Sequence, residues 1–167
     1  MEYGISMGSN EGVRLHYLRA GRDALAAIEG VALAATSHIY ETEPVGVQPE
    51  NRDKPFLNAV AIVETCLSEY ELLDKLHGIE DAFGRLRTED RNAPRSLDMD
   101  ILYAGERCFT DEHLEIPHPG WNQRRFVVQP LADVRPSLIL PGETRTVAQV
   151  LSTLPREPEV ILYSEDW

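Results

Sequence analysis

Two aspartates, two positions apart, are the strongest chemical signal in the sequence. Asp98 and Asp100 alternate with Leu97, Met99 and Ile101. Successive side chains of a β-strand point to opposite faces, so a strand here would place both carboxylates on one face, with Cα atoms roughly 6.5–7 Å apart. Mg²⁺ is held by one or two carboxylates and completed by water and substrate phosphates. Because paired carboxylates also repel each other, the spacing favours a magnesium site over a merely solvated strand face.

A cluster of arginines comes shortly before this pair. It comprises Arg85, Arg87, Arg91 and Arg95, in a chain with a formal net charge of -12. The planar guanidinium binds phosphate through several donors at once. Phosphoryl transfer depends mainly on positioning and on neutralising charge. The cluster therefore points to a small polyanionic ligand, although a solvated charged loop remains the alternative because Glu89 and Asp90 lie within it.

His118 is a third candidate for chemistry. It lies between Pro117 and Pro119 and shortly before Arg124. A histidine held this rigidly can bind phosphate or stabilise a leaving group, but a histidine in a proline-rich turn is also an ordinary surface feature. The remaining histidines show no metal-ligand spacing with one another, so zinc is not expected: His16, His38, His77 and His113.

Composition narrows the class of protein. The chain has 167 residues, 43% of them hydrophobic, which fits one globular domain. Its acidity argues against binding nucleic acid, and no apolar run approaches the ~20 residues that would span a bilayer. Cys66 and Cys108 are too few for a disulfide framework and are interpreted as reduced thiols. No signal peptide is evident, so we expect a cytoplasmic protein with no membrane or nucleic-acid partner.

Hydrophobic periodicity and capping signals predict the elements that position these residues. Strands are expected at 3–7, 31–41, 56–65, 97–103 and 160–163. One helix should follow the turn Gly8–Asn10, capped by Ser9 or Asn10, and end near Gly30. A second should open at the capping box of Ser68 and Glu71 and end at Gly84, and a third should lie near 146–154. Residues 44–55 are expected to form a long loop, and residues 126–140 two short apolar stretches broken by Pro130 and Pro136.

The coarse order is strand, helix, strand, strand, helix, strand, followed by C-terminal additions. This order is typical of the α+β ferredoxin-like fold, in which helices pack on one face of an antiparallel sheet.

These residues together resemble a known family, 6-hydroxymethyl-7,8-dihydropterin pyrophosphokinase of folate biosynthesis. The matching segments are Gly8–Asn10, 40–44, 56–59, 80–85, 93–100, 116–119, 124–126 and 129–131. No single motif is decisive, but their order and spacing are specific, and the resemblance runs from about residue 3 to residue 142. It implies that 1–167 is a single pyrophosphokinase domain, which we expect to act as a monomer.

The resemblance also implies a reaction and its residues. Pyrophosphate would pass from ATP to the hydroxymethyl group of the pterin, giving AMP and the pterin pyrophosphate, with two Mg²⁺ ions between the ATP phosphates and the aspartates. The implied catalytic residues are Arg85, Arg95, Asp98 and Asp100. The implied ATP contacts are His77, Glu80, Arg87, Arg91, Ile101, His118 and Arg124. The implied pterin pocket comprises Thr42, Val45, Phe56, Asn58 and Phe126. Departures from the family pattern are Glu43, His77, Asn92 and Pro119.

Two other functions remain open at this point. A nucleotidyltransferase or cyclase also mounts paired aspartates on a ferredoxin-like sheet, but it would attack the α-phosphorus and release pyrophosphate. An acidic metal-buffering module would need the carboxylates but not the arginines. The product formed from ATP distinguishes the first rival, and failure to bind ATP with magnesium would favour the second.

Overall fold

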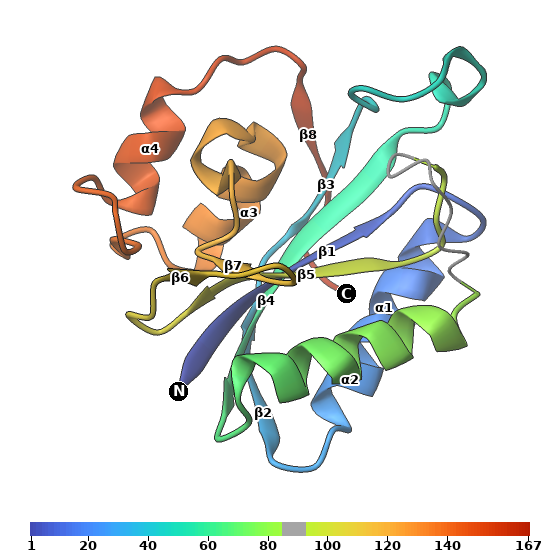
Figure 1. The fold of residues 1–167 in the computed structure, drawn as a ribbon. Helices are drawn as coiled ribbons and strands as arrows, with labels where there is room; N and C mark the ends of the chain where they lie inside the picture. Colours follow the sequence, from blue (N-terminus) through green and yellow to red (C-terminus); the bar gives the residue numbers. More distant parts are fainter. Residues whose placement is uncertain (85–92) are drawn as a thin grey trace.

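Figure 1 shows the computed structural model, which describes residues 1–84 and 93–167. The elements follow the chain as β1 (Glu2–Ser9), α1 (Arg14–Ala26), β2 (Val31–Thr36), β3 (Ile39–Thr42), the 3-10 turn η1 (Pro49–Asn51), β4 (Phe56–Thr65), α2 (Glu69–Ala82), β5 (Asp98–Ala104), β6 (Phe109–Thr110), β7 (Glu115–Ile116), the 3-10 turn η2 (Trp121–Gln123), α3 (Arg125–Val134), α4 (Val147–Thr153) and β8 (Val160–Ser164).

The main sheet is antiparallel and has the order β5-β1-β4-β3-β8, with β2 also pairing with β4. The central strands β1 and β4 are paired from Glu2↔Glu64 to Ser9↔Leu57. Strand β5 lies on the other side of β1, as the ferredoxin-like order requires. The predicted fold class is therefore confirmed.

The segment predicted as one strand, residues 31–41, forms two strands instead. Both β2 and β3 pair with β4, and the chain changes register between them at Ser37. The Ser37 amide donates to the Val60 carbonyl, and the Ser37 hydroxyl accepts from the Val60 amide at 2.8 Å. Between β2 and β3 the Ser37 hydroxyl thus accepts the hydrogen bond from the Val60 amide that a backbone carbonyl would accept in a continuous strand pair. The sequence pattern could not show this, because it depends on a strand far along the chain.

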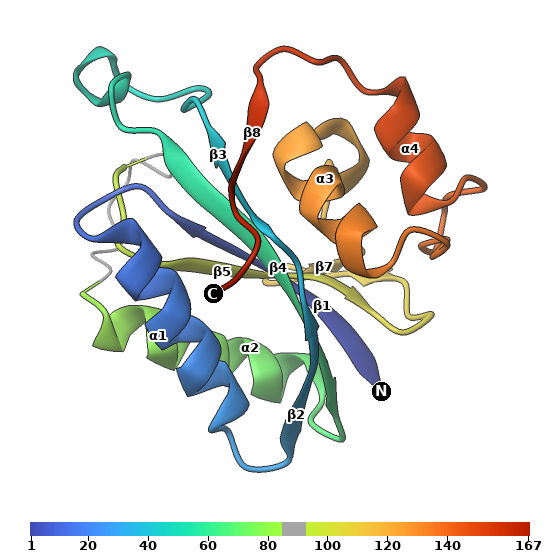
Figure 2. The same cartoon turned by 180° about the vertical axis from the view of Figure 1, so that it is seen from behind.

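Helices cover both faces of the sheet (Figures 1 and 2). Helices α1 and α2 pack on one face, as predicted, while α3 and α4, which belong to the C-terminal additions, cover the other. Strand β4 contributes to the hydrophobic core on each face of the sheet. Ala59 and Ala61 belong to the core beneath α1 and α2, and Val60 and Ile62 belong to the core beneath α3 and α4. The prediction of helices on one face was therefore incomplete, since Pro130 lies inside α3 and hid its helical pattern.

The predicted helix caps have different outcomes. The capping box is confirmed, with the Glu71 amide donating to the Ser68 hydroxyl and the Ser68 amide donating to the Glu71 carboxylate at 2.8 Å. The predicted cap at Ser9 or Asn10 was wrong. Ser9 is the last residue of β1, and α1 begins at Arg14 without a side-chain cap. The Asn10 side chain instead accepts a hydrogen bond from the Arg95 amide at 2.8 Å.

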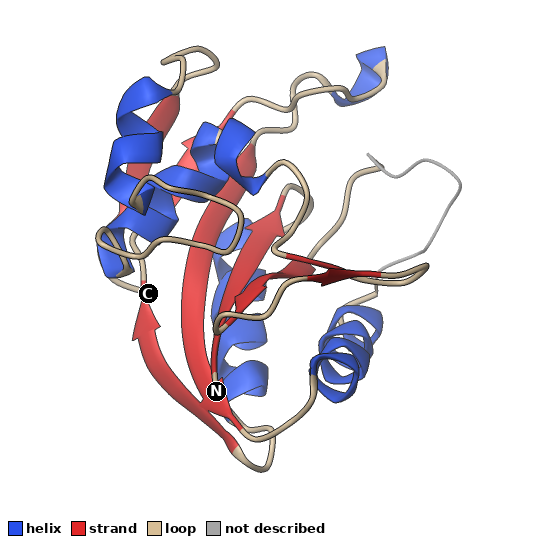
Figure 3. Ribbon diagram, turned by 60° about the vertical axis from the view of Figure 1, so that its left-hand side comes forward, coloured by secondary structure: helices blue, strands red, loops and turns tan. Residues whose placement is uncertain are grey.

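Figure 3 distinguishes the helices and strands from the long connection between β3 and β4, which carries η1. The predicted loop over 44–55 is therefore confirmed, apart from this short turn. Among the described helices, none combines the length and apolar character needed to cross a bilayer.

Candidate active site

Strand β5 places both aspartates on one face of the sheet. Asp98 is opposite Gly8 of β1 and Asp100 is opposite Ser6. Met99 between them is buried, and its amide donates to the Glu80 carboxylate of α2 at 2.7 Å. The predicted alternation is therefore present, and helix α2 holds the backbone that carries the two carboxylates.

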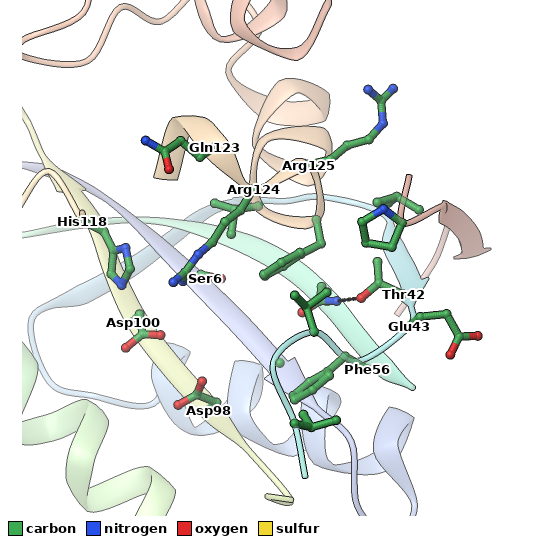
Figure 4. Close-up of a pocket in the computed structure, with 18 of the residues that line it drawn as sticks. Ser6, Thr42, Glu43, Phe56, Asp98, Asp100, His118, Gln123, Arg124 and Arg125 are labelled. Carbon is green, nitrogen blue, oxygen red and sulfur yellow. Dashed lines mark hydrogen bonds between the residues drawn. The ribbon is translucent and has the colours of Figure 1, made fainter. Parts of the chain in front are cut away.

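A cavity of about 340 Å³ opens over this face (Figure 4). Its walls come from β1, β3, β4, β5, the start of the 43–55 connection, the residues around the start of α3 and the chain before β8. Ten of the sequence-predicted site residues line it: Thr42, Val45, Phe56, Asn58, Arg95, Asp98, Asp100, His118, Arg124 and Phe126. Segments more than 80 residues apart in the chain thus meet in one site.

Basic side chains surround the carboxylates. Arg95 Nη1 lies 3.3 Å from Asp98 Oδ1. Two hydrogen bonds fix the Arg95 backbone against Asn10, because the Arg95 amide donates to the Asn10 side chain and the Asn10 amide donates to the Arg95 carbonyl at 3.1 Å. In Figure 4, His118 and Arg124 also point toward the space in front of the aspartates. This end of the cavity combines two carboxylates with the guanidinium groups of Arg95 and Arg124, as a site for a metal–phosphate complex requires.

His118 is attached to the strand that carries the aspartates. Its amide donates to the Leu102 carbonyl of β5 at 2.8 Å. Burial, together with the nearby Arg124 charge, lowers the pKa of His118 below its usual value of 6.5. The imidazole is therefore neutral near pH 7, able to donate one hydrogen bond and accept another.

The other end of the cavity suits a flat polar ligand. Phe56 and Phe126 line the cavity and are only partly buried, whereas Tyr3 and Tyr103 in the core are buried. Asn58 and Thr42 are buried, with 6% and 4% exposed, and the Asn58 amide donates to the Thr42 hydroxyl at 2.8 Å. Partly exposed aromatic rings and an ordered amide in one cavity can stack and orient a heteroaromatic ring.

Gly8 connects the two ends. It is paired with Asn58 of β4 on one side and with Asp98 of β5 on the other. A Cβ atom at this position would come within 3.4 Å of Asn58 Oδ1 and 3.8 Å of Phe56 Cδ1. Glycine therefore leaves open the space between the aromatic end and the carboxylates. The sequence interpretation of Gly8 as part of a turn was wrong, since it belongs to β1.

Several predicted contacts are not among the described residues that line the cavity. Glu80 is fully buried beneath β5, and Ile101 lies in the hydrophobic core, so only its backbone can face a ligand. His77 lies on α2, partly buried. The roles predicted for these residues stay predictions. Arg85, Arg87, Arg91 and the departure at Asn92 lie outside the described residues.

The start of β8 and the chain before it supply part of the wall that sequence reasoning missed. The residues are Pro155, Glu157, Pro158 and Val160. They reach the cavity because β8 pairs with β3, which sets Val160 opposite Thr42. No local pattern indicates this pairing. Glu43, one of the departures from the family pattern, also lines the cavity, and in Figure 4 its carboxylate points away from the aspartates.

The donor set fits magnesium. Among the described residues no cluster of three or more histidine, cysteine or acidic side chains could enclose a metal ion. The protein offers two carboxylates on an open cavity wall, with Asp98 partly buried and Asp100 exposed. Mg²⁺ keeps several water or phosphate ligands, so an open pair suits it better than a closed cage.

Comparison with known proteins gives the same family as the sequence motifs. A family model described as 7,8-dihydro-6-hydroxymethylpterin-pyrophosphokinase (HPPK) matches residues 4–136. The chain is 39% identical over 139 residues to 2-amino-4-hydroxy-6-hydroxymethyldihydropteridine pyrophosphokinase of Haemophilus influenzae, covering 83% of this chain and 84% of the relative. The protein of the same name from Pseudomonas aeruginosa is 37% identical over 153 residues, covering 92% of this chain and 91% of the relative.

A solved structure adds support for the fold. Wild-type HPPK-DHPS of Plasmodium falciparum with pteroate matches with a TM-score of 0.71 at 14% identity. The match covers 90% of this chain but only 42% of that longer chain, so it bears on the fold alone. The family match and the identities to curated relatives are decisive: the chain belongs to the 7,8-dihydro-6-hydroxymethylpterin-pyrophosphokinase family, the pyrophosphokinases of folate biosynthesis.

Proposed function

We propose that this pyrophosphokinase transfers the pyrophosphoryl group of ATP to the hydroxymethyl oxygen of 6-hydroxymethyl-7,8-dihydropterin, with two Mg²⁺ ions bound at Asp98 and Asp100. The observation that carries this proposal is the pairing of Gly8 in β1 with Asn58 in β4 on one side and with Asp98 in β5 on the other. It sets an amide suited to a pterin and a carboxylate suited to a metal–phosphate complex in one cavity, with nothing bulkier than glycine between them.

The pterin would stack between Phe56 and Phe126 at the aromatic end. Asn58 uses one amide hydrogen for Thr42, so its second hydrogen and its carbonyl oxygen can pair with the donor–acceptor edge of the ring. That hydrogen bond also restricts the rotation of the Asn58 side chain. An ordered amide of this kind discriminates strongly, because a ring that lacks the matching edge leaves buried polar groups unpaired.

ATP would extend its phosphates along the carboxylate end. Bound Mg²⁺ supplies charge neutralisation and holds the phosphate oxygens in a fixed orientation. Arg95 and Arg124 would bind phosphate oxygens, and neutral His118 can donate a hydrogen bond to another. The pterin oxygen then attacks the β-phosphorus. A new bond forms between the pterin oxygen and Pβ, and the bond from Pβ to the oxygen that bridges the α- and β-phosphorus breaks. AMP leaves with that bridging oxygen, and the hydroxyl proton passes to solvent.

Residues 1–167 are proposed to act as a single pyrophosphokinase domain. Support comes from the C-terminal additions, which contribute Val160 and its preceding residues to the cavity wall and α3 to the second layer. A chain truncated near residue 142 would therefore lose one wall of the pterin end.

Product analysis tests the proposal. The protein is incubated with ATP, MgCl₂ and the pterin alcohol, and the products are separated by chromatography and identified by mass. AMP and the pterin pyrophosphate are expected, and turnover should stop when EDTA removes magnesium. ADP with a pterin monophosphate, or pyrophosphate with a nucleotidyl adduct, would overturn the proposed reaction.

A further inference from the structure

Arg14, the first residue of α1, contacts three segments near the pterin end of the cavity. Its Nη2 lies 2.7 Å from the Glu41 carboxylate of β3. Its Nη1 donates a hydrogen bond to the Pro55 carbonyl at 2.9 Å. Its guanidinium also lies 5.9 Å from the centre of the Tyr163 ring of β8. The side chain is only 24% exposed, so these contacts are partly shielded from water.

The contacted residues directly precede two residues of the pterin pocket. Glu41 comes before Thr42, and Pro55 comes before Phe56. Thr42 and Phe56 form the last pair of the β3–β4 ladder, after which the chain leaves the sheet in the long 43–55 connection. Terminal ladder pairs open at low free-energy cost. The two pocket residues therefore lie where the hairpin would separate most easily.

The planar guanidinium suits the task of holding both strands. Its two terminal nitrogens have a fixed geometry, so binding Glu41 through one and Pro55 through the other keeps β3 and β4 at a fixed separation. The contact with Tyr163 extends this clamp to β8, whose Val160 is paired with Thr42 and lines the cavity. Arg14 itself is not among the residues that line the cavity.

We infer that Arg14 is a positioning residue for the pterin: it holds the ends of the 43–55 connection so that Thr42 and Phe56 are in place before the ligand arrives. This inference rests on the proposed function, because it assumes that the Thr42–Phe56 end binds the pterin.

The test measures the two substrates separately. Arg14→Met keeps an unbranched apolar side chain similar to the arginine stem but removes the guanidinium and with it both polar contacts. Pterin affinity is measured through the fluorescence of the pterin alcohol. It should weaken by about tenfold, because a charged hydrogen bond that orders the site is lost. ATP affinity should not change. Hydrogen exchange in peptides covering 41–58 should be faster than in the unaltered protein.

Matched variants distinguish the clamp from a general effect on α1. Arg19→Met makes the same change on an exposed residue of the same helix and should leave pterin affinity and exchange unchanged. Glu41→Gln should weaken pterin affinity less than Arg14→Met, because the Pro55 contact persists. The double variant Arg14→Met/Glu41→Gln should bind the pterin no more weakly than Arg14→Met alone, as expected for two residues that act through the same contact. Arg14→Lys should be intermediate, since one ammonium cannot reproduce both contacts.

The outcomes separate this inference from the function on which it rests. If the unaltered protein does not bind the pterin alcohol, the proposed function fails and the inference fails with it. If the unaltered protein binds and Arg14→Met binds equally well, only the inference is wrong. Equal weakening of ATP and pterin, or the same loss in Arg19→Met, would also overturn it, because either result indicates a general structural role.

Discussion

Asn58 and Asp98 lie in one row of the sheet, on either side of Gly8. Neighbouring strands are about 4.8 Å apart, so the two Cα atoms are separated by roughly 10 Å. All three positions line the same cavity. The residue that would orient the pterin and the residue that would hold magnesium are thus fixed relative to each other by backbone pairing rather than by flexible loops.

Gly8→Ala should therefore weaken pterin use without unfolding the protein. The added methyl group would contact Asn58 Oδ1 at 3.4 Å, within the usual van der Waals range, so the free energy of unfolding should change by no more than about 1 kcal/mol. The methyl group would nevertheless occupy space between the pterin end and the carboxylates. The KM for the pterin should rise by about tenfold while the KM for ATP stays constant. An unchanged pterin KM would show that the ligand does not pass over Gly8.

Asp98→Asn and Asp100→Asn should each lower kcat by on the order of a thousandfold, because a metal ion contributes several kcal/mol of charge stabilisation in the transition state. The thermal unfolding midpoint should change little, since neither side chain is in the hydrophobic core. Asp74→Asn, the same change at an exposed residue of α2 outside the cavity, is the control. If Asp98→Asn and Asp100→Asn both keep most of their activity at saturating magnesium, the aspartates do not hold the metal.

Arg95→Lys should fail to restore the function of the arginine. Arg95 Nη1 lies 3.3 Å from Asp98 Oδ1, and a planar guanidinium can contact a carboxylate and a phosphate in a fixed geometry. A lysine ammonium is a point charge and cannot hold both groups in the same geometry. We expect kcat to fall by about a hundredfold with a nearly unchanged urea midpoint. Full activity in the lysine variant would mean that charge alone is needed at this position.

The stability of the free protein should depend on His118 below neutral pH. Burial and the Arg124 charge lower the pKa of His118 in the folded state, while the unfolded chain has the usual value. The unfolded state therefore binds more protons as the pH falls through about 6.5, and the free energy of unfolding decreases. His118→Gln should lose less stability between about pH 7.5 and pH 5.5 in urea titrations. Equal slopes for the two proteins would contradict the lowered pKa.

Local patterns predicted the features that local chemistry determines. The alternation around Asp98 and Asp100 and the capping box of Ser68 and Glu71 depend on residues close in sequence, and the structure has both. Asn10 shows the limit of this reasoning. An asparagine before a helical pattern is typical of a cap, but here its side chain bonds to Arg95, 85 residues away.

The parts of the site that were missed come from long-range packing. Val160 reaches the cavity because β8 pairs with β3. Glu80, predicted to contact ATP, supports the Met99 amide between the two aspartates. Arg14 gains its position from contacts with Glu41 and Pro55. No periodic pattern or characteristic spacing in the sequence indicates these contacts, because each depends on how separate elements pack together.

The fate of the ATP phosphates tests the central claim most directly. A single turnover is run with magnesium, the pterin alcohol and ATP labelled in turn at the α-, β- or γ-phosphorus. The β- and γ-labels should both appear in the pterin product in equal amounts, and the α-label should remain entirely in AMP. Transfer of the γ-label alone, or of the α-label, would contradict pyrophosphoryl transfer at this site.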